Sequence, residues 1–589
     1  MKFKGLLAIA LVICVLPAVK GVGATVESNW ADFLHYTAID KFDLAKGYGE
    51  ALVASNPDPL VMLELANENP NGYALLVKLS STKNELTDVS TKILAIIEQG
   101  RFARKSDPQI INAEIKRLST TARGRITALE RLKNAGEYAV VYMVSAMQDP
   151  ARRDELPNIV WALGQLGKEA VGPLVAALQV EDVGVKSEII RALGQIKYPQ
   201  AGPYLKFVAE KSDSPQIAAL ALDNVAKIDA GAARTASAEL FYLLGEQYYN
   251  RVDSLTPPMD VNFVNIWFWN GEKQSLVREK VNPKYYNELM AMRTCEFALK
   301  ADPNAGKAIG LWIASFFRAQ STGIAMPEYF GASHPSAMTY ATTAGPEYLQ
   351  QALARAMSRK ETYVVLNVVE ALGTSGGEKS LMYVVGTQQP LITALVYDDQ
   401  AVKFSSALAI AMSRPAASFD GADLVAKYLG QALASEANGL SDEAKAQYAM
   451  RAAHAMLKLS QCRNKVIDIG LAQGQIITVA TDSSKGELQK IAMLILSNLA
   501  SPDAQRTLAK LALDADSDMQ VRMLAFGGLT DSAKMNGNLL TDEQVNGLYE
   551  IISSADAPQE LRAAASGSYG ALNLPSRKVK DFILDQARS

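Results

Sequence analysis

The apolar positions between residues 159 and 228 recur in three rows, each with the spacing of one face of an α-helix. The rows consist of Val160, Leu163 and Leu166, of Ile190, Leu193 and Ile196, and of Leu222, Val225 and Ile228. Successive rows are 30 and 32 residues apart, which leaves room for a second helix between them. Periods of this size are typical of stacked helical hairpins, because no single hairpin can bury its own apolar face. The pattern therefore predicts an all-α fold, an α-solenoid of helical hairpins.

Two segments carry a more specific signature. In "ALGQLGKEAVGPLVAAL" and "ALGQIKYPQAGPYLKFVA", a helix ends in Ala-Leu-Gly, a turn follows, and Pro173 or Pro203 begins the second helix, where proline forfeits no hydrogen bond. These segments resemble HEAT repeats of the short, lyase-associated type. The resemblance covers residues 150–235 and returns more loosely after residue 365. Some proteins with this repeat act on bilin chromophores, but most are interaction surfaces, so the resemblance implies the fold and protein binding rather than lyase activity.

The first 24 residues have the pattern of an export signal. Lys2 and Lys4 precede the short apolar run 6–16, and Val22-Gly23-Ala24 predicts cleavage between Ala24 and Thr25. A retained membrane anchor is the alternative, although the run is shorter than the roughly 20 residues of a spanning helix. Cleavage would remove three lysines and no acidic residue, and would take the net charge from −3 to −6. We therefore expect a protein of the periplasm, cell envelope or extracellular space without an integral membrane span.

Residues 25–100 form the N-terminal region of short helices. Within residues 29–57, Trp30, Tyr36, Ala45, Ala51 and Pro57 lie at or next to the aromatic, small and terminating positions of a tetratricopeptide unit. The segment thus resembles one tetratricopeptide-type hairpin, although any helical hairpin with alternating large and small residues has a similar pattern.

Residues 101–236 form the predicted HEAT-like array, which begins with a basic helical region. An apolar stripe that includes Ile111, Leu118 and Ile126 predicts one continuous helix over 108–133. From residue 101 to residue 133 there are nine Lys or Arg and three Asp or Glu. This basic face is either a solvated helix surface or a docking surface for an acidic partner or anionic lipid. Its candidate residues are Arg101, Arg104, Lys105, Lys116, Arg117, Arg123 and Arg125.

Residues 237–360 interrupt the repeat pattern and contain three of the five tryptophans. Alternating residues around Asn270-Gly271 predict a β-hairpin over about 261–281, because both positions of a tight hairpin turn favour these residues. We expect Trp267 and Trp269 on one side of it. Aromatic side chains there could stack on a sugar or grip a peptide, or they could pack on flanking helices.

The segment 321–346 contains several prolines and glycines and predicts a long loop, which is either functional or a packing insert. It holds His334, the one histidine of three outside a helical pattern and the candidate for a role in binding. The mature chain also retains Cys295 and Cys462, which are either two buried thiols or the two halves of a disulfide.

Residues 361–589 predict a second HEAT-like array, with a capping box at Thr541 and Gln544.

The three dispersed histidines and the absence of a metal-ligand or nucleophile motif predict no catalytic residues, no metal and no cofactor. Because aromatic residues are not interleaved with the basic ones, we expect no nucleic-acid partner. The sequence predicts an exported scaffold for protein–protein interaction, or alternatively a carbohydrate- or peptide-binding protein that uses the central aromatic module.

Overall fold

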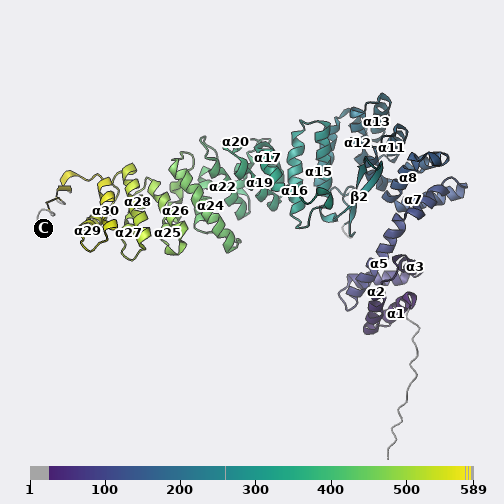
Figure 1. Ribbon diagram of the computed structural model, residues 1–589, viewed down its shortest axis with the longest axis horizontal. Helices are drawn as coiled ribbons and strands as arrows, with labels where there is room; N and C mark the ends of the chain where they lie inside the picture. Colours follow the sequence, from purple (N-terminus) through teal and green to yellow (C-terminus); the bar gives the residue numbers. More distant parts are fainter. Residues whose placement is uncertain (1–24, 259–260, 382, 578, 581–582, 585–589) are drawn as a thin grey trace, which may run out of the picture. The chain divides into compact units, whose positions relative to one another are not determined.

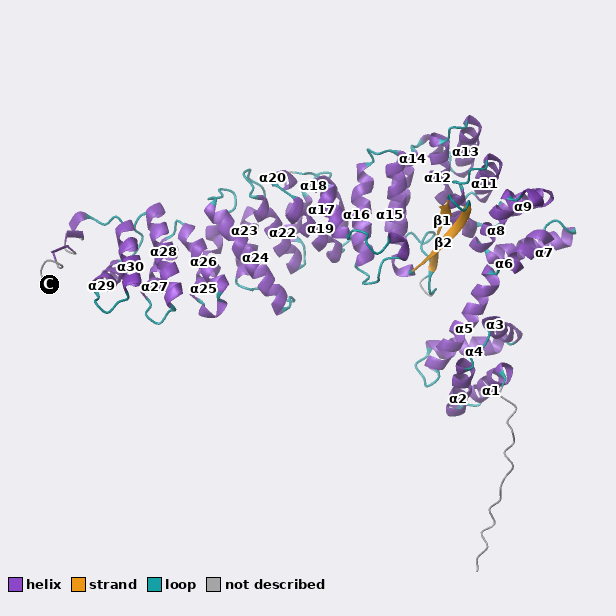
Figure 2. Ribbon diagram, viewed as in Figure 1, coloured by secondary structure: helices purple, strands orange, loops and turns teal. Residues whose placement is uncertain are grey.

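The computed structural model describes the chain except for residues 1–24, 259–260, 382, 578, 581–582 and 585–589. The predicted export signal therefore lies outside the described residues. Within them, the fold consists of thirty α-helices, several short 3-10 helices and one two-stranded sheet (Figures 1 and 2). The prediction of an all-α solenoid with a single β-hairpin is confirmed.

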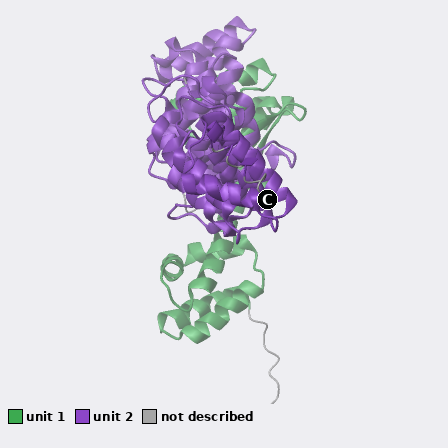
Figure 3. Cartoon of the chain, turned by 90° about the vertical axis from the view of Figure 1, so that its left-hand side faces the viewer, with its two compact units in different colours: residues 1–201, 267–277 green, residues 202–266, 278–589 purple. Residues whose placement is uncertain are grey.

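The chain divides into two compact units (Figure 3). The first runs up to Ala201 and includes Trp267–Val277, and the second consists of Gly202–Ile266 and Arg278–Ser589. The helices of the first unit are α1 Val26–Ala38, α2 Phe42–Ala54, α3 Pro59–Glu68, α4 Pro70–Ser81, α5 Thr87–Ser106, α6 Pro108–Arg117, α7 Ala122–Ala135, α8 Glu137–Gln148, α9 Leu156–Leu163, α10 Val171–Ala177 and α11 Val183–Ile196.

Several helices of the first unit begin with the same local device, a capping side chain followed by proline. Asp58, Asn69 and Asp107 accept hydrogen bonds from backbone N–H groups in the first turns of α3, α4 and α6. Each is followed by a proline, whose missing N–H costs nothing at a first helical position. These short polar sequences therefore divide the region into hairpins, of which α1 and α2 are the first. The tetratricopeptide resemblance of that hairpin stays a prediction.

The single helix predicted over 108–133 is wrong. The chain leaves helical geometry between Leu118 and Thr121, and the Thr121 hydroxyl accepts a hydrogen bond from the Gly124 N–H at the start of α7. Because the apolar spacing continues across this break, periodicity alone does not detect it. The capping preference of Ser-Thr-Thr decides the local structure instead. As a result Ile126, expected in the buried stripe, is 63% exposed.

The three apolar rows lie on α9, α11 and α13, apart from Leu166, which follows the end of α9, and α10 and α12 supply the second helices between them. The central residue of each row, Leu163, Leu193 or Val225, has no exposed surface. Leu222 departs from its row with 40% exposure. The repeat period therefore locates the helices correctly and identifies most of their buried faces.

The predicted hairpin is present as strands β1 Val264–Asn270 and β2 Ser275–Val281. Its turn is longer than the predicted two-residue type. The chain turns over 271–274, Gln274 has a φ of 45°, and the Asn270 carboxamide accepts a hydrogen bond from the Lys273 N–H. The asparagine stabilises the turn with its side chain, and neither Asn270 nor Gly271 has the positive φ that a two-residue turn would require.

The second unit contains α12 Gly202–Lys211, α13 Pro215–Ile228, α14 Ser237–Tyr249, α15 Pro283–Ala301, α16 Gly306–Gln320, α17 Ala337–Ala344, α18 Pro346–Ser358, α19 Thr362–Ser375, α20 Glu378–Leu381, α21 Pro390–Thr393, α22 Gln400–Ser413, α23 Ala422–Leu433, α24 Asp442–Gln461, α25 Gln473–Thr481, α26 Glu487–Asn498, α27 Pro502–Leu513, α28 Met519–Asn536, α29 Asp542–Ser553 and α30 Gln559–Ala571. In its C-terminal part, α19, α22, α24, α26, α28 and α30 pack one against the next. The helices α23, α25, α27 and α29 form a second row, which packs on the first. The predicted capping box of Thr541 and Gln544 is present at the start of α29.

The loop predicted over 321–346 is only partly irregular. It contains the helix α17, whose first turn is capped by the Ser336 hydroxyl on the Thr339 N–H. Pro335 and Pro346 flank this short helix, so the prolines mark its boundaries where we expected a continuous loop.

Candidate functional site

The basic face lies on α5, α6 and α7 of the first unit. Arg104, Lys105, Lys116, Arg117 and Arg123 are exposed, and Arg101 and Arg125 are half-buried. Within the described residues, no carboxylate pairs with Arg104, Lys105, Lys116 or Arg123, whereas Arg101 lies 3.6 Å from Glu98. Most of these cations are therefore available to a partner.

The acidic residues of the same region are already engaged. Glu114 is 7% exposed and pairs with Arg131 and, at 3.9 Å, with Arg117. Asp107 accepts hydrogen bonds from the first turn of α6. Because the carboxylates of Glu114 and Asp107 are engaged in this way, neither forms an ion pair with Arg104, Lys105, Lys116 or Arg123 among the described residues.

Contacts from the segment 152–161 extend this face. The Arg152 guanidinium donates to the Asn112 carboxamide at 3.2 Å, and the Asn158 amide donates to the Ser119 hydroxyl at 3.2 Å. The Arg125 guanidinium lies over the ring of Trp161, 5.8 Å from its centroid. These contacts hold α9 beside the connection between α6 and α7.

Trp161 is 41% exposed, an unusual position for the largest side chain in proteins. The Arg125 Nε donates to the Leu118 carbonyl at 3.1 Å, which fixes the guanidinium, and its two terminal nitrogens contact no acceptor among the described residues. The sequence contains the signal for this exposed ring, because the inward row Val160, Leu163 and Leu166 leaves Trp161 facing outward.

The two tryptophans of the hairpin have different environments. Trp267 is 5% exposed, its indole N–H donates to the Glu137 carboxylate at 2.6 Å, and Tyr138 packs edge-on against it at 6.2 Å. Trp267 thus anchors the hairpin tip within the first unit and presents no open ring face. Trp269 is half-buried, and its indole N–H has no acceptor among the residues that the structure describes.

His334 lies in a small aromatic group of the second unit. Its Nδ1 is 2.8 Å from the Pro335 carbonyl oxygen, and its ring lies 5.1 Å from Phe330 and 5.9 Å from Phe316 between centroids. These contacts pack the half-buried imidazole against the connection that precedes α17.

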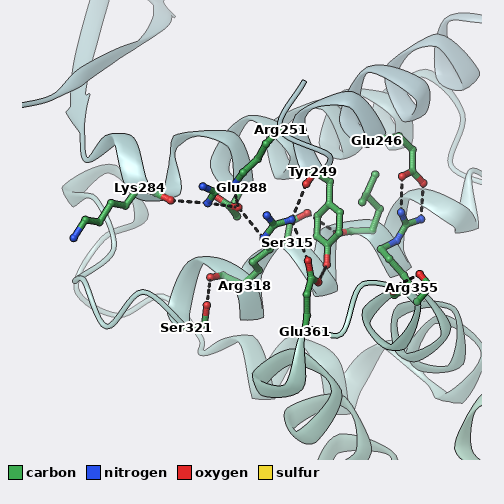
Figure 4. Close-up of polar contacts among 12 residues, drawn as sticks. Glu246, Tyr249, Arg251, Lys284, Glu288, Ser315, Arg318, Ser321, Arg355 and Glu361 are labelled. Atoms are coloured by element: carbon green, nitrogen blue, oxygen red, sulfur yellow. Dashed lines mark hydrogen bonds and ion pairs between the residues drawn. The ribbon is translucent and has the colours of Figure 1, made fainter. Parts of the chain in front are cut away.

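A buried polar network, which the sequence did not reveal, joins the helices α14, α15, α16, α18 and α19 (Figure 4). At one end, Glu288 has no exposed surface and lies 2.9 Å from Arg251 and 3.1 Å from Arg318. Arg318 also donates to the Tyr249 carbonyl at 2.6 Å and pairs with Glu361 at 3.2 Å. One guanidinium therefore connects three segments of the chain.

At the other end of the network, Arg355 binds Glu246 through two nitrogens and donates to the Tyr242 hydroxyl at 3.2 Å. Burial and the hydrogen bond to Glu246 raise the pKa of Tyr242 to about 12. Burial alone would raise the pKa of Glu246, but hydrogen bonds from Arg355 and Tyr242 outweigh it and hold that pKa below its usual value.

Tyr249 lies between the two ends. The guanidinium carbons of Arg318, Arg355 and Arg359 are 4.7, 5.5 and 5.7 Å from its ring centroid, and its hydroxyl donates to Glu361. Burial raises the pKa of the Tyr249 hydroxyl. Because the charged groups are paired with one another, the network is suited to holding five helices in register.

The two cysteines differ in exposure. Cys295 is buried, which raises the pKa of its thiol, Cys462 is exposed, and neither forms a disulfide.

In the described part of the chain, no cluster of His, Cys, Asp or Glu has the arrangement of a metal site. Across the same residues, none of the helices combines the length and apolar character needed to cross a bilayer.

Comparison with known proteins identifies part of the array. Residues 145–226 match the family of HEAT repeats, which agrees with the sequence resemblance. The finer resemblance to the short, lyase-associated type of this repeat stays a prediction. No curated protein matches the chain.

Solved structures with a similar arrangement include importin beta, with 13% identity, a TM-score of 0.20, and coverage of 85% of this chain and 69% of that one. The karyopherin Kap121p, bound to the extreme C-terminus of the protein phosphatase Cdc14p, has 13% identity, a TM-score of 0.25, and coverage of 95% and 68%. She4p has 13% identity, a TM-score of 0.27, and coverage of 93% and 84%.

Proposed function

We propose that this protein is an exported helical-repeat scaffold of the cell envelope that binds other proteins. The observation that carries the proposal is the HEAT-repeat array in residues 145–226 together with the adjoining basic face, where exposed cations lack acidic partners among the described residues. Stacked repeats present extended, rigid surfaces, and unpaired surface charge steers association with a complementary partner. The proposal includes no catalytic step.

Export is the part of the proposal that rests on the sequence alone. The basic residues, the apolar run and the small residues at 22–24 support cleavage before Thr25. The described helices begin directly afterwards, with Thr25 as the capping residue of α1. Cleavage at this point would leave the first helix and its cap intact.

The function is tested with a tagged chain expressed at native level in the source organism. After chemical crosslinking of intact cells, we expect the tagged chain to co-purify with one or more envelope proteins in a fixed ratio. The purified partner must then rebind the mature chain, residues 25–589, in size-exclusion chromatography. Recovery of the chain alone, with and without crosslinking, would contradict a scaffold.

Trp269 favours one alternative, a carbohydrate- or peptide-binding protein that uses the central aromatic module. The indole N–H of Trp269 is itself buried, but the exposed part of its half-buried ring could stack on a sugar or contact a peptide. The matched variants Trp269→Phe and Trp267→Phe separate this role from packing. If glycan or peptide binding depends on Trp269 while Trp267→Phe only lowers stability, the alternative holds.

A further inference from the structure

Aromatic side chains from three neighbouring segments of the second unit contact one another. The ring centroids of Trp312 on α16 and Tyr340 on α17 are 4.9 Å apart, and both rings contact Phe316, at 5.3 and 6.2 Å. Phe316 also contacts Phe330 at 5.8 Å, and Phe330 contacts Tyr329 at 4.9 Å. We call this group the aromatic surface, which consists of Trp312, Tyr329, Phe330, His334 and Tyr340 around the buried Phe316.

The outer rings of the aromatic surface are accessible to solvent. Tyr329 and Tyr340 are 38% and 39% exposed, and Trp312 is half-buried. Trp and Tyr are enriched at the energetic centres of protein interfaces, because each brings a large rigid ring whose burial costs little conformational entropy. The grouping of these rings therefore leaves apolar area that a partner can cover.

A carboxylate lies among these rings. The Trp312 indole N–H donates to Glu296 Oε1 at 3.1 Å, and the Glu296 side chain is exposed. Burial and the charge of Glu296 raise the pKa of the Tyr329 hydroxyl, against the effect of Arg293. Glu296 therefore lies close to both Trp312 and Tyr329.

The charge of this region is negative and is not neutralised locally. Glu328 precedes Tyr329 and is exposed. Neither Glu296 nor Glu328 forms an ion pair with a described residue. From residue 319 to residue 354 the sequence contains two glutamates and no aspartate, lysine or arginine. The ligand that complements these rings is therefore a cation.

We propose that the aromatic surface binds a basic segment of a partner protein, with an arginine or lysine side chain over the Trp312 and Tyr340 rings and its charge beside Glu296. A cation over an aromatic ring is attracted by the ring quadrupole, most strongly for tryptophan. The carboxylate adds a charge-assisted hydrogen bond. This inference rests on the proposed scaffold function and adds a site whose charge preference is opposite to that of the basic face.

Hydrogen bonding around the rings favours a basic segment over a sugar. A sugar needs polar groups that pair with its hydroxyls, but the indole N–H already donates to Glu296, and the Thr342 and Thr343 hydroxyls donate to backbone carbonyls of α17. His334 Nδ1 lies 2.8 Å from the Pro335 carbonyl oxygen. Negative charge and ring surface remain, and both complement a guanidinium or an ammonium group.

The test uses the mature chain and a fluorescein-labelled glycine–serine peptide that contains paired arginines. Fluorescence anisotropy measures its binding to the wild type, to Tyr340→Leu and to Glu296→Gln, in which the amide oxygen can still accept from Trp312. Trp161→Leu is the aromatic control, since Trp161 is 41% exposed and its ring is already covered by Arg125. Glu443→Gln removes an exposed carboxylate from α24 as the charge control.

We expect Tyr340→Leu and Glu296→Gln each to weaken binding by about threefold to tenfold. Glu296→Gln should also reduce the salt dependence of binding, since part of the attraction is screened by ions. Both controls should bind like the wild type, and circular dichroism should be the same for all variants. A peptide with glutamines in place of the arginines should not bind.

Competition separates a basic peptide from other ligands of aromatic surfaces. The proposal is overturned if the glutamine peptide binds as well as the arginine peptide, or if either Tyr340→Leu or Glu296→Gln binds as tightly as the wild type. It is also overturned if chito-oligosaccharides or phosphatidylcholine vesicles displace the peptide more effectively than unlabelled peptide does. A partner captured by crosslinking that rebinds Tyr340→Leu at full strength leaves the scaffold function correct and this site wrong.

Discussion

Glu288 shows how single residues stabilise the second unit. Its carboxylate has no exposed surface, and a buried charge is tolerated only when partners replace the water that it loses. Arg251 and Arg318 supply that compensation from α14's C-terminal end and from α16. The partners are separated by 30 residues or more from Glu288 in sequence, so no local pattern indicates which cations pair with which acids.

Removal of one arginine from this ion-pair network should therefore lower the free energy of unfolding substantially. Arg318→Ala removes one of the two ion-pair partners of Glu288 and the recorded ion-pair partner of Glu361, and it frees the Tyr249 carbonyl. We expect a loss of about 3–5 kcal/mol in the free energy of unfolding, as for other broken buried ion pairs. Guanidinium denaturation followed by circular dichroism measures it.

Lys445→Ala is the matched control, because Lys445 pairs with Asp442 at 3.5 Å on the surface of α24. Exposed pairs of this kind contribute little, so its unfolding curve should overlay that of the wild type. Equal effects of the two substitutions would mean that the network around Glu288 does not stabilise the fold through burial.

The lowered pKa of Glu246 predicts that the stability of the fold depends on pH. Its pKa is held below 4.5 in the folded protein by Arg355 and Tyr242, against the effect of burial. A carboxylate with a depressed folded pKa contributes stability above its unfolded pKa, and this contribution is lost as the pH falls through the folded value. Glu246→Gln should thus be less stable than the wild type at pH 7.

The difference between Glu246→Gln and the wild type should narrow as the pH falls below about 4.5. Urea unfolding across this range measures the narrowing, with Asp442→Asn as a control at an exposed carboxylate. A difference that is constant from neutral pH to acid would show that Glu246 acts only through packing.

At the scale of helices and strands, the sequence predicted which helices and strands exist better than it predicted where each begins and ends. The Asp-Pro and Asn-Pro pairs before α3, α4 and α6 and the capping box of α29 are local signals, and each coincides with a helix start. The break at Leu118–Thr121 and the longer hairpin turn were missed, since apolar spacing and the Asn-Gly pair both favoured simpler structures. Side-chain hydrogen bonds decided these places, and such bonds depend on neighbours that the pattern does not contain.

Close contact between α3 and α5 gives a test at this scale. A Cβ atom on Gly100 would lie 1.9 Å from the Pro59 carbonyl oxygen, a backbone atom that cannot rotate away. Gly100→Ala should therefore force the two helices apart and lower the free energy of unfolding by about 1–3 kcal/mol. Hydrogen–deuterium exchange of peptides from α3 and α5 should report faster exchange in both.

The opposite result is expected for Gly47→Ala in α2, which serves as the control. No atom lies within 4 Å of a Cβ at that exposed helical position, so the substitution should stabilise the helix by up to about 1 kcal/mol through helix propensity. If Gly100→Ala also stabilised the protein, the close packing of α3 on α5 would be disproved.

For the whole molecule, the repeat period was the most informative signal, because a solenoid repeats one local packing solution. It located the helices and their buried faces without any knowledge of tertiary contacts. The same regularity concealed the exposed Trp161, which lies between the inward-facing residues of the first row, whereas the candidate residues Trp267 and His334 lie where the repeat pattern is interrupted. Both of those side chains pack against neighbours, whereas the exposed tryptophan lies inside the repeat.

Export is the remaining prediction about the whole chain, and it depends on residues 22–25. Signal peptidase recognises small or β-branched residues one and three positions before the cut, which here are Ala24 and Val22. We expect Ala24→Arg to abolish cleavage, so that the chain keeps residues 1–24 and stays with the membrane fraction. Gly23→Leu, at the tolerant position between them, should be processed like the wild type. Intact mass and N-terminal sequencing decide the outcome: a mature chain that begins at Thr25 supports export, and an unprocessed wild-type chain in the cytoplasm contradicts it.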